Sequence, residues 1–198
     1  MTNLEITFLI FAYLCGTIPF GFIICKLIGK KDIRKHGSKS IGATNVARIL
    51  GKKWAGITVA LDGLKGLIPI LLAKTYFYDS GDLFFGLVGL LAILGHIFPV
   101  WLKLKGGKGI STTIFVLFAI DWKLGLCLCL VWVLFFLLTK VSAIGSLMGI
   151  LSATLLSSFI SSFETMSICT IICIIVVIRH KENIKRLLQK KELGFKKK

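Results

Sequence analysis

Charge is scarce in this sequence, and negative charge is scarcer still. Charged residues make up 17% of the 198 residues, and only nine residues are Asp or Glu. A soluble domain carries about 25% charged residues, whereas this chain is 56% apolar and has a mean hydropathy of +0.87. This composition excludes a disordered chain, a secreted disulfide framework and most soluble enzymes.

The residue patterns of several common active sites are also missing. No pair of carboxylates is placed for glycoside chemistry, and no G-x-S-x-G elbow accompanies a Ser-His-Asp order. The His-x4-Asp acyltransferase motif is absent, because Ile41, Trp101 and Lys185 stand where its Asp would be. The six Cys residues all lie in apolar runs, where they act as small hydrophobic side chains. We therefore expect no metal, no cofactor and no nucleic-acid partner.

Long apolar runs separate the polar segments. A membrane-spanning helix needs about 20 residues, and six runs approach that length: 4–27, 54–77, 83–102, 124–139, 143–161 and 165–178. A seventh run, 109–120, is too short for an upright span. These runs predict an all-α polytopic membrane helix bundle, a single domain over 1–198 with seven transmembrane helices, or with five or six as the alternative count.

The basic residues orient this bundle. Of the 25 Lys and Arg residues, nine lie in 26–53, three in 103–108, one at 140 and nine from 179 onward. With seven helices these four segments share one face, which the positive-inside rule places in the cytoplasm, with the N-terminus outside and the C-terminus cytoplasmic. The first run lacks a preceding basic stretch and a small-residue cleavage site, so we expect a retained helix and not a cleaved signal peptide.

The first basic segment, 34–53, has features of an anion site. Its Gly and Ser residues between 37 and 42 suit a tight backbone bend around a bound anion. A short helix over 44–50 would place Asn45 and Arg48 on one face, and Gly51 would end it. The alternative is a solvated basic loop that attracts anionic lipid headgroups.

The second basic segment is a glycine loop with the sequence KGGKG at 105–109. Three glycines in four positions let successive N–H groups converge on an anion, and Lys105 and Lys108 add positive charge. The residues that follow open a helix, whose N-terminus favours an anion, and Ser111 and Thr112 add hydroxyl donors. A flexible hinge is the alternative, which explains the glycines but not the lysines.

The third basic segment follows the last apolar run. If the helix continues, His180 and Asn183 align on one face, while Glu182 lies between Arg179 and Arg186 and forms a clamped ion pair. A stop-transfer basic cluster is the alternative, although it would not need the His, Asn and Glu side chains.

A few polar residues lie within or beside the apolar runs. Charges at such depth are costly unless they are paired, so we expect Asp62 and Lys65 to form a structural pair, with a functional role for the two residues as the alternative. Without another polar residue beside it in the sequence, His96 is more typical of a residue that packs between helices than of a catalytic base. Ser142 follows Lys140 in a short turn, where it can cap a helix or bind a ligand.

Five motifs, taken together, match a known family. They are GTIPFG at 16–21, GATNVAR at 42–48, GHIFP at 95–99, KGGKG at 105–109 and RHKENI at 179–184. In these motifs, over almost its whole length, the chain resembles the bacterial acyl-phosphate-dependent glycerol-3-phosphate acyltransferases. The resemblance implies transfer of an acyl group from acyl phosphate to position 1 of sn-glycerol 3-phosphate, the first acylation step of phospholipid synthesis. It also implies a multi-pass protein of the bacterial inner (cytoplasmic) membrane whose active site faces the cytoplasm.

The resemblance further implies roles for individual residues. The catalytic residues would be Ser38, Lys108, His180 and Asn183, and the substrate-binding residues Asn45, Arg48, Lys105, Gly106, Gly107, Gly109, Thr112, Ser142 and Glu182. The implied partners are the two substrates, membrane lipid and the soluble phosphate acyltransferase that forms acyl phosphate. The chain departs from the family at Lys39 and Ser40, where Gly and Asn are usual, and at Lys191, where Gly usually precedes Glu192.

An acyl phosphate carries a good leaving group, so the enzyme mainly needs to position substrates and stabilise charge. We expect Arg48 and Lys108 to hold phosphates, and His180 and Asn183 to orient the glycerol hydroxyl or the developing oxyanion. His180 acts either as a general base or only as a binding residue. Two other functions remain open: a transporter for organic phosphates, for which no inverted repeat is found, and a non-catalytic scaffold that binds anionic lipid.

Overall fold

The computed structural model describes residues 1–194. Within this range the chain forms ten α-helices, two short 3-10 helices and no strand. In chain order they are α1 (Asn3–Gly16), α2 (Phe20–Leu27), η1 (Ile33–Lys35), α3 (Ala43–Leu50), α4 (Lys52–Tyr76), α5 (Gly81–Ile97), η2 (Val100–Leu102), α6 (Ile110–Ile120), α7 (Trp122–Thr139), α8 (Ser142–Ile160), α9 (Phe163–Arg179) and α10 (Lys181–Leu188). The predicted all-helical class is confirmed.

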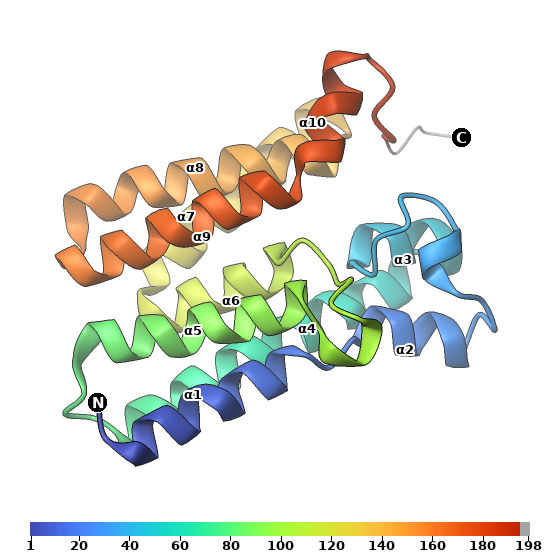
Figure 1. Ribbon diagram of the computed structural model, residues 1–198. Helices are drawn as coiled ribbons and strands as arrows, with labels where there is room; N and C mark the ends of the chain where they lie inside the picture. Colours follow the sequence, from blue (N-terminus) through green and yellow to red (C-terminus); the bar gives the residue numbers. More distant parts are fainter. Residues whose placement is uncertain (195–198) are drawn as a thin grey trace.

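The long helices lie side by side with roughly aligned axes (Figure 1). Helices α8 and α9 run along one side of the bundle and α1 and α4 along the other, with α5 and α6 between them. Their shared core includes Val88, Val116, Leu117, Leu128 and Ile172, which are completely buried. Close packing of these apolar faces holds the ends of α5, α6 and α9 in fixed relation to one another.

Several of these helices have the length and composition of membrane spans. Among the described residues, five stretches are long and apolar enough to cross a membrane: Asn3–Ile28, Lys52–Tyr76, Gly81–Leu102, Trp122–Thr139 and Ser142–Ile160. Helices α9 and α10, bent by 56° at their junction, would form a sixth as a broken span. Many Leu, Ile and Phe side chains on the outer faces are exposed, which suits a lipid environment. Helix α6 has 11 residues, as short as the sequence predicted.

The first apolar run is not one continuous helix. Helix α1 ends at Gly16 and α2 begins at Phe20, with Pro19 at its N-cap. Proline has no N–H to donate and disfavours a helical residue before it, so the backbone breaks here. The break leaves the carbonyl of Ile18 available to Lys65, whose Nζ donates to it at 2.7 Å.

A second, smaller core lies beyond α2. Cys25, Ile33, Ile41, Val46 and Leu102 are buried together. These side chains come from α2, η1, the loop before α3, α3 itself and η2. They seat α3 against the end of the bundle that carries η2 and the glycine loop.

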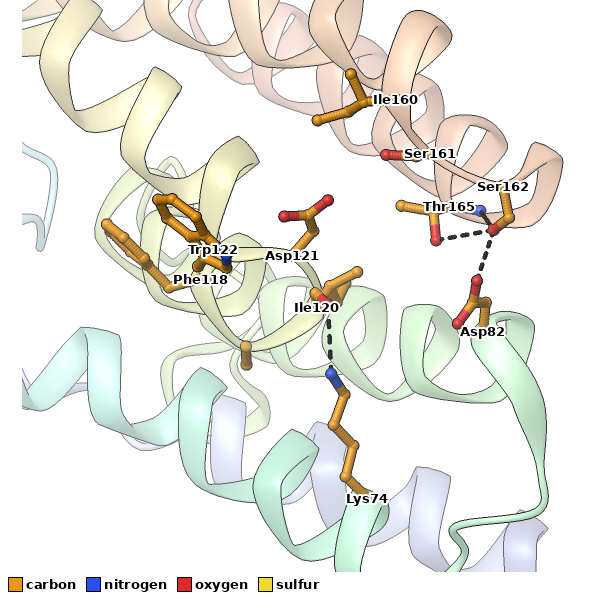
Figure 2. A pocket seen from close by; sticks show the side chains of 11 residues that line it. Lys74, Asp82, Phe118, Ile120, Asp121, Trp122, Ile160, Ser161, Ser162 and Thr165 are labelled. Atoms are coloured by element: carbon orange, nitrogen blue, oxygen red, sulfur yellow. Dashed lines mark hydrogen bonds between the residues drawn. The ribbon is translucent and has the colours of Figure 1, made fainter.

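The opposite end of the bundle holds an open hollow of about 400 Å³ (Figure 2). Lys74 Nζ donates to the carbonyl of Ile120 at 3.3 Å, and the Ser162 hydroxyl donates to Asp82 Oδ2 at 2.7 Å. These bonds tie α4 to the end of α6 and α5 to the start of α9. The hollow therefore lies a full helix length from the glycine loop, and none of the predicted site residues lines it.

Candidate active site

The three basic segments meet at one end of the bundle. Arg179 Nη2, at the end of α9, donates to the carbonyl of Gly107 in the glycine loop at 3.4 Å. The hydroxyl oxygens of Thr44 on α3 and Ser142 on α8 lie 3.0 Å apart. Segments that are far apart in the sequence thus share one site, as the charge pattern predicts.

Helix α3 forms as predicted. It covers Ala43–Leu50, with Gly42 at its N-cap, and it ends at Gly51, whose φ of +88° lies in the region that glycine tolerates. Arg48 lies in its last turn and donates from Nη2 to the carbonyl of Leu193 at 2.7 Å. The guanidinium is thereby drawn toward the C-terminal segment, where the third basic segment lies.

Asn45 on α3 has a different position from the one implied by the resemblance. Its side chain is buried, its Oδ1 accepts the N–H of Ser38 at 3.0 Å, and its Nδ2 donates to three loop carbonyls: those of Ile33, His36 and Ser40. Both the oxygen and the nitrogen of the amide are thus engaged by this loop. Asn45 therefore fixes the position of Ser38 and holds the loop that precedes α3.

The departure at Lys39 has a conformational cost. Lys39 adopts a φ of +59°, in the left-handed region, and so does Gly37 at +56°. A residue with a Cβ is strained in this conformation, by about 1 kcal/mol or more. The glycine that the resemblance implies at position 39 would tolerate this backbone conformation, whereas Lys39 retains it at a cost in stability.

The glycine loop is held tightly against the end of α5. Gly106 donates its N–H to the carbonyl of Ile97, and Gly107 donates to the carbonyl of His96, both at 3.1 Å. The prediction that the N–H groups of Gly106 and Gly107 face an anion is therefore wrong, because α5 carbonyls already use them. Two such bonds also argue against a flexible hinge.

The remaining N–H groups of the loop are placed for an anion. Gly109, with a φ of +91°, is the N-cap of α6. Among the described residues, the N–H groups of Lys108, Gly109 and Ile110 have no hydrogen-bond acceptor. Unpaired N–H groups at a helix N-terminus suit a phosphate group. The anion site of this loop therefore lies at its second half, next to Lys108.

Three other predicted side chains lie elsewhere than expected. Thr112 is buried and donates its hydroxyl to the backbone carbonyl of Asp62 at 2.8 Å, so it supports the fold and does not face the site. Lys105 is exposed at the surface. Glu182 is also exposed, and the predicted clamp is wrong, because Arg186 pairs with Glu192 instead, at 2.7 Å. The spacing of charges along one helix did not identify this partner in the C-terminal segment.

The third segment bends where a continuous helix was expected. Helix α9 ends at Arg179 and α10 begins at Lys181, with His180 at the corner. His180 and Asn183 are nevertheless both buried, at 2% and 3% exposure. Asn183 Nδ2 donates to Glu192 Oε1 at 2.8 Å, while its buried Oδ1 has no hydrogen-bond partner among the described residues. An unpaired buried acceptor of this kind suits a hydroxyl donor on a ligand.

The protonation states at this corner follow from the contacts. The Nδ1 of His180 lies 2.8 Å from the carbonyl oxygen of Val176. Burial, and then the charge of Lys108, lower the pKa of His180 to about 4, so the ring is neutral near pH 7. Burial also lowers the pKa of Lys108 to about 8, which leaves its ammonium mostly charged near neutral pH.

Two site residues were missed by the sequence-based interpretation. Glu192 accepts hydrogen bonds from Asn183 and Arg186. Among the described residues, it is the one carboxylate that lies among the basic side chains of the site, which include Lys108 and Arg186. Arg179 stacks over the ring of Phe98, 5.5 Å from its centroid, and its buried Nε has no hydrogen-bond partner among the described residues. We define the cationic cluster as Arg48, Lys108, Arg179 and Arg186. With a single carboxylate opposing them, these residues favour a ligand with more than one negative charge.

Comparisons with known proteins agree with this arrangement. A family model described as glycerol-3-phosphate acyltransferase matches residues 6–190. The glycerol-3-phosphate acyltransferase of Pelagibacter ubique is 42% identical over 185 residues, which cover 93% of this chain and 94% of the relative. The protein of the same name from Ehrlichia ruminantium is 41% identical over 190 residues, which cover 96% of each chain.

Solved structures are similar over nearly the whole fold. A crystal structure of PlsY (YgiH), an integral membrane glycerol 3-phosphate acyltransferase, in its glycerol 3-phosphate form matches with a TM-score of 0.92 at 38% identity and covers 98% of this chain and 96% of that chain. The lysophosphatidic acid form of the same protein matches with a TM-score of 0.89 at 37% identity, with the same coverage of both chains.

Proposed function

Because the chain belongs to the glycerol-3-phosphate acyltransferase family, we propose that it transfers an acyl group from acyl phosphate to position 1 of sn-glycerol 3-phosphate. The products are lysophosphatidic acid and inorganic phosphate. The similar crystal structures hold the acceptor substrate in one form and the acylated product in the other. The observation that carries the proposal is the cationic cluster, which lies beside unpaired N–H groups at the start of α6.

The phosphate groups of both substrates are held by this cluster. Lys108 and the N–H groups of Gly109 and Ile110 bind one phosphate, where the helix N-terminus adds a positive dipole end. Arg48 binds a second phosphate, because a guanidinium pairs with phosphate through two parallel hydrogen bonds. Holding both reactants in one site converts an encounter of two molecules into a reaction within one complex.

The acyl transfer itself needs little chemistry from the side chains. The glycerol hydroxyl oxygen attacks the carbonyl carbon of acyl phosphate, the bond from that carbon to the phosphate oxygen breaks, and the hydroxyl proton leaves on the departing phosphate. Nε2 of His180 and Oδ1 of Asn183 accept hydrogen bonds from the glycerol hydroxyls and orient them. The departing phosphate takes the proton itself, so a His180 ring kept neutral by burial, with its pKa lowered to about 4, is needed only to bind and orient the acceptor.

Ser38 and Ser142 complete the edge of the site. Asn45 fixes the backbone of Ser38. The adjacent Gly37 lies close to Arg48, since a Cβ placed on Gly37 would be 3.8 Å from Arg48 Cδ. Ser142 lies across from Thr44 on the same side. Their hydroxyls supply neutral hydrogen bonds to the phosphate or the acyl carbonyl. These directional bonds orient the bound group, which attraction by charge alone does not do.

The proposed topology places this chemistry at the cytoplasmic surface of the bacterial inner membrane. It has seven spans, with α6 as a short span sheltered by its neighbours, the N-terminus outside and the C-terminus in the cytoplasm. The gathering of the basic segments at one end of the bundle supports this orientation through the positive-inside rule. A site facing the cytoplasm is accessible to soluble glycerol 3-phosphate and to the enzyme that forms acyl phosphate.

An assay of the purified full chain tests the proposal. We expect palmitoyl phosphate and glycerol 3-phosphate together to release phosphate and form lysophosphatidic acid, whereas palmitoyl-CoA as the donor gives no product. Product formed equally from palmitoyl-CoA would contradict the assigned donor. Uptake of labelled glycerol 3-phosphate into sealed vesicles without an acyl donor would indicate a transporter instead.

A further inference from the structure

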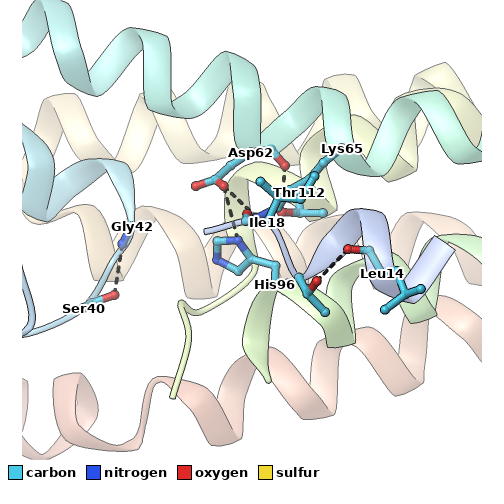
Figure 3. Close-up of polar contacts among 9 residues, drawn as sticks. Leu14, Ile18, Ser40, Gly42, Asp62, Lys65, His96 and Thr112 are labelled. Atoms are coloured by element: carbon cyan, nitrogen blue, oxygen red, sulfur yellow. Dashed lines mark hydrogen bonds and ion pairs between the residues drawn. The ribbon is translucent and has the colours of Figure 1, made fainter. Parts of the chain in front are cut away.

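Three ionisable side chains outside the cationic cluster are buried together inside the bundle. Asp62 and Lys65 on α4 and His96 on α5 are 1%, 5% and 3% exposed. Lys65 Nζ and Asp62 Oδ1 form an ion pair at 2.8 Å, and His96 Nδ1 lies 3.6 Å from the same oxygen (Figure 3). The sequence predicts the Asp62–Lys65 pair but not its contact with His96. Apolar side chains would pack these helices at a lower cost than buried charges, so the group needs a further explanation.

The contacts of the Asp62–Lys65 pair reach two segments that frame the site. Lys65 Nζ donates to the carbonyl of Ile18, in the break between α1 and α2 that leads to α3. The backbone carbonyl of Asp62 accepts the hydroxyl of Thr112, in the first turn of α6. The pair therefore connects the start of α6, where the anion site lies, to the chain that leads into α3.

His96 supports the glycine loop directly. Its carbonyl accepts the N–H of Gly107, and a methyl group at Gly107 would overlap its ring nitrogen Nε2. A methyl group at Gly106 would overlap the carbonyl oxygen of His96. The loop thus rests on both the backbone and the ring of His96, and the opposite edge of that ring faces Asp62.

We propose that Asp62, Lys65 and His96 are positioning residues that hold loop 105–109 and the first turn of α6 in the conformation that binds phosphate. They touch no substrate and act through Gly107 and Thr112. The identity of the substrates in this inference rests on the proposed function, whereas the binding of a phosphate anion does not. Without these residues the loop shifts, and the N–H groups beside Lys108 no longer converge on the phosphate.

The double variant Asp62→Asn/Lys65→Met tests this role, because it removes both charges and leaves neither one buried without its partner. We expect the KM for glycerol 3-phosphate and the dissociation constant of inorganic phosphate, measured by calorimetry on the detergent-solubilised chain, to rise about tenfold or more, as small displacements of a binding group cause. We expect the melting temperature to stay close to that of the wild type. Thr58→Val is the matched control, since Thr58 is buried on the same helix and bonds only to its own helix.

The two readouts separate positioning from a merely structural role. Partial misfolding lowers the maximal rate and leaves the KM and the phosphate dissociation constant unchanged, so that result would overturn the inference. If the wild type binds phosphate but shows no acyl transfer, the proposed function fails, and the phosphate dissociation constants of the variants still decide the positioning role.

A second pair of variants decides the matter if the double variant does not fold. His96→Asn retains a donor toward Asp62, whereas His96→Leu retains only apolar volume. We expect His96→Leu to weaken phosphate binding about tenfold and His96→Asn to restore most of this loss. Equal phosphate affinity in His96→Leu and the wild type would overturn the inference.

Discussion

His180 donates from Nδ1 to the carbonyl oxygen of Val176 at 2.8 Å, and this bond fixes the tautomer of the ring. A carbonyl can only accept, so Nε2 remains the acceptor. Because burial and Lys108 also lower the pKa of His180 to about 4, the ring stays neutral at physiological pH. His180 is therefore placed to accept a hydrogen bond from the acceptor hydroxyl through Nε2.

The variant His180→Ala should raise the KM for glycerol 3-phosphate about tenfold, since it removes one hydrogen bond of about 1 kcal/mol or slightly more. The kcat should change much less, because the departing phosphate takes the proton. Steady-state kinetics with saturating palmitoyl phosphate measure both values. A kcat reduced by about a thousandfold or more, within the range of a lost general base, would show that His180 takes part in proton transfer.

The pH dependence of kcat/KM should follow the titration of the Lys108 ammonium. Burial lowers the pKa of its ammonium to about 8, so the group is charged below this pH and neutral above it. Phosphate binding, and with it kcat/KM, should fall as the pH rises through about 8. In Lys108→Arg the charge persists at every such pH, and the decrease should disappear even if kcat is lower. An unchanged alkaline decrease in Lys108→Arg would assign the titration to another group.

Arg48→Ala should weaken glycerol 3-phosphate binding about 10- to 100-fold, because a charge-assisted hydrogen bond contributes about 1.5–3 kcal/mol. Calorimetric titration of the detergent-solubilised protein measures the effect. Lys52→Ala is a suitable control, since Lys52 is exposed at the start of α4, at the same end of the bundle. If both variants lose affinity equally, the effect comes from general charge and not from a clamp at Arg48.

Lys39→Gly should stabilise the protein by about 1 kcal/mol, because it relieves a left-handed conformation at a residue with a Cβ. Its activity should remain close to that of the wild type. The control is Lys35→Gly in η1, where no positive φ is present and glycine should be slightly destabilising. Thermal unfolding in detergent gives the two shifts, and a lower melting temperature for Lys39→Gly would contradict the strain at this position.

Local features of the site could be predicted from the sequence. The glycine at position 51 marks the end of α3, and the spacing of Asp62 and Lys65 indicates their ion pair. The run 109–120 is recognisably too short for an upright span. The charge asymmetry predicts that the basic segments gather at one end. All of these follow from residue spacing within one segment or from the distribution of charge between segments.

Contacts between distant segments could not be predicted in the same way. The glycine loop is rich in N–H groups, but only the fold shows that carbonyls of α5 already bind those of Gly106 and Gly107. The pairing of Arg186 with Glu192 depends on how the C-terminal segment folds back over α10, which no helical period encodes. The bend at His180 likewise has no Pro or Gly to mark it.

Formation of lysophosphatidic acid by the wild type and by Lys108→Met, measured side by side with palmitoyl phosphate and glycerol 3-phosphate, tests the central claim most directly. The account predicts product from the wild type, and a kcat/KM reduced at least about 100-fold in a variant that is folded but lacks this phosphate-binding charge. Equal product formation by the two proteins would contradict a phosphate site at the start of α6.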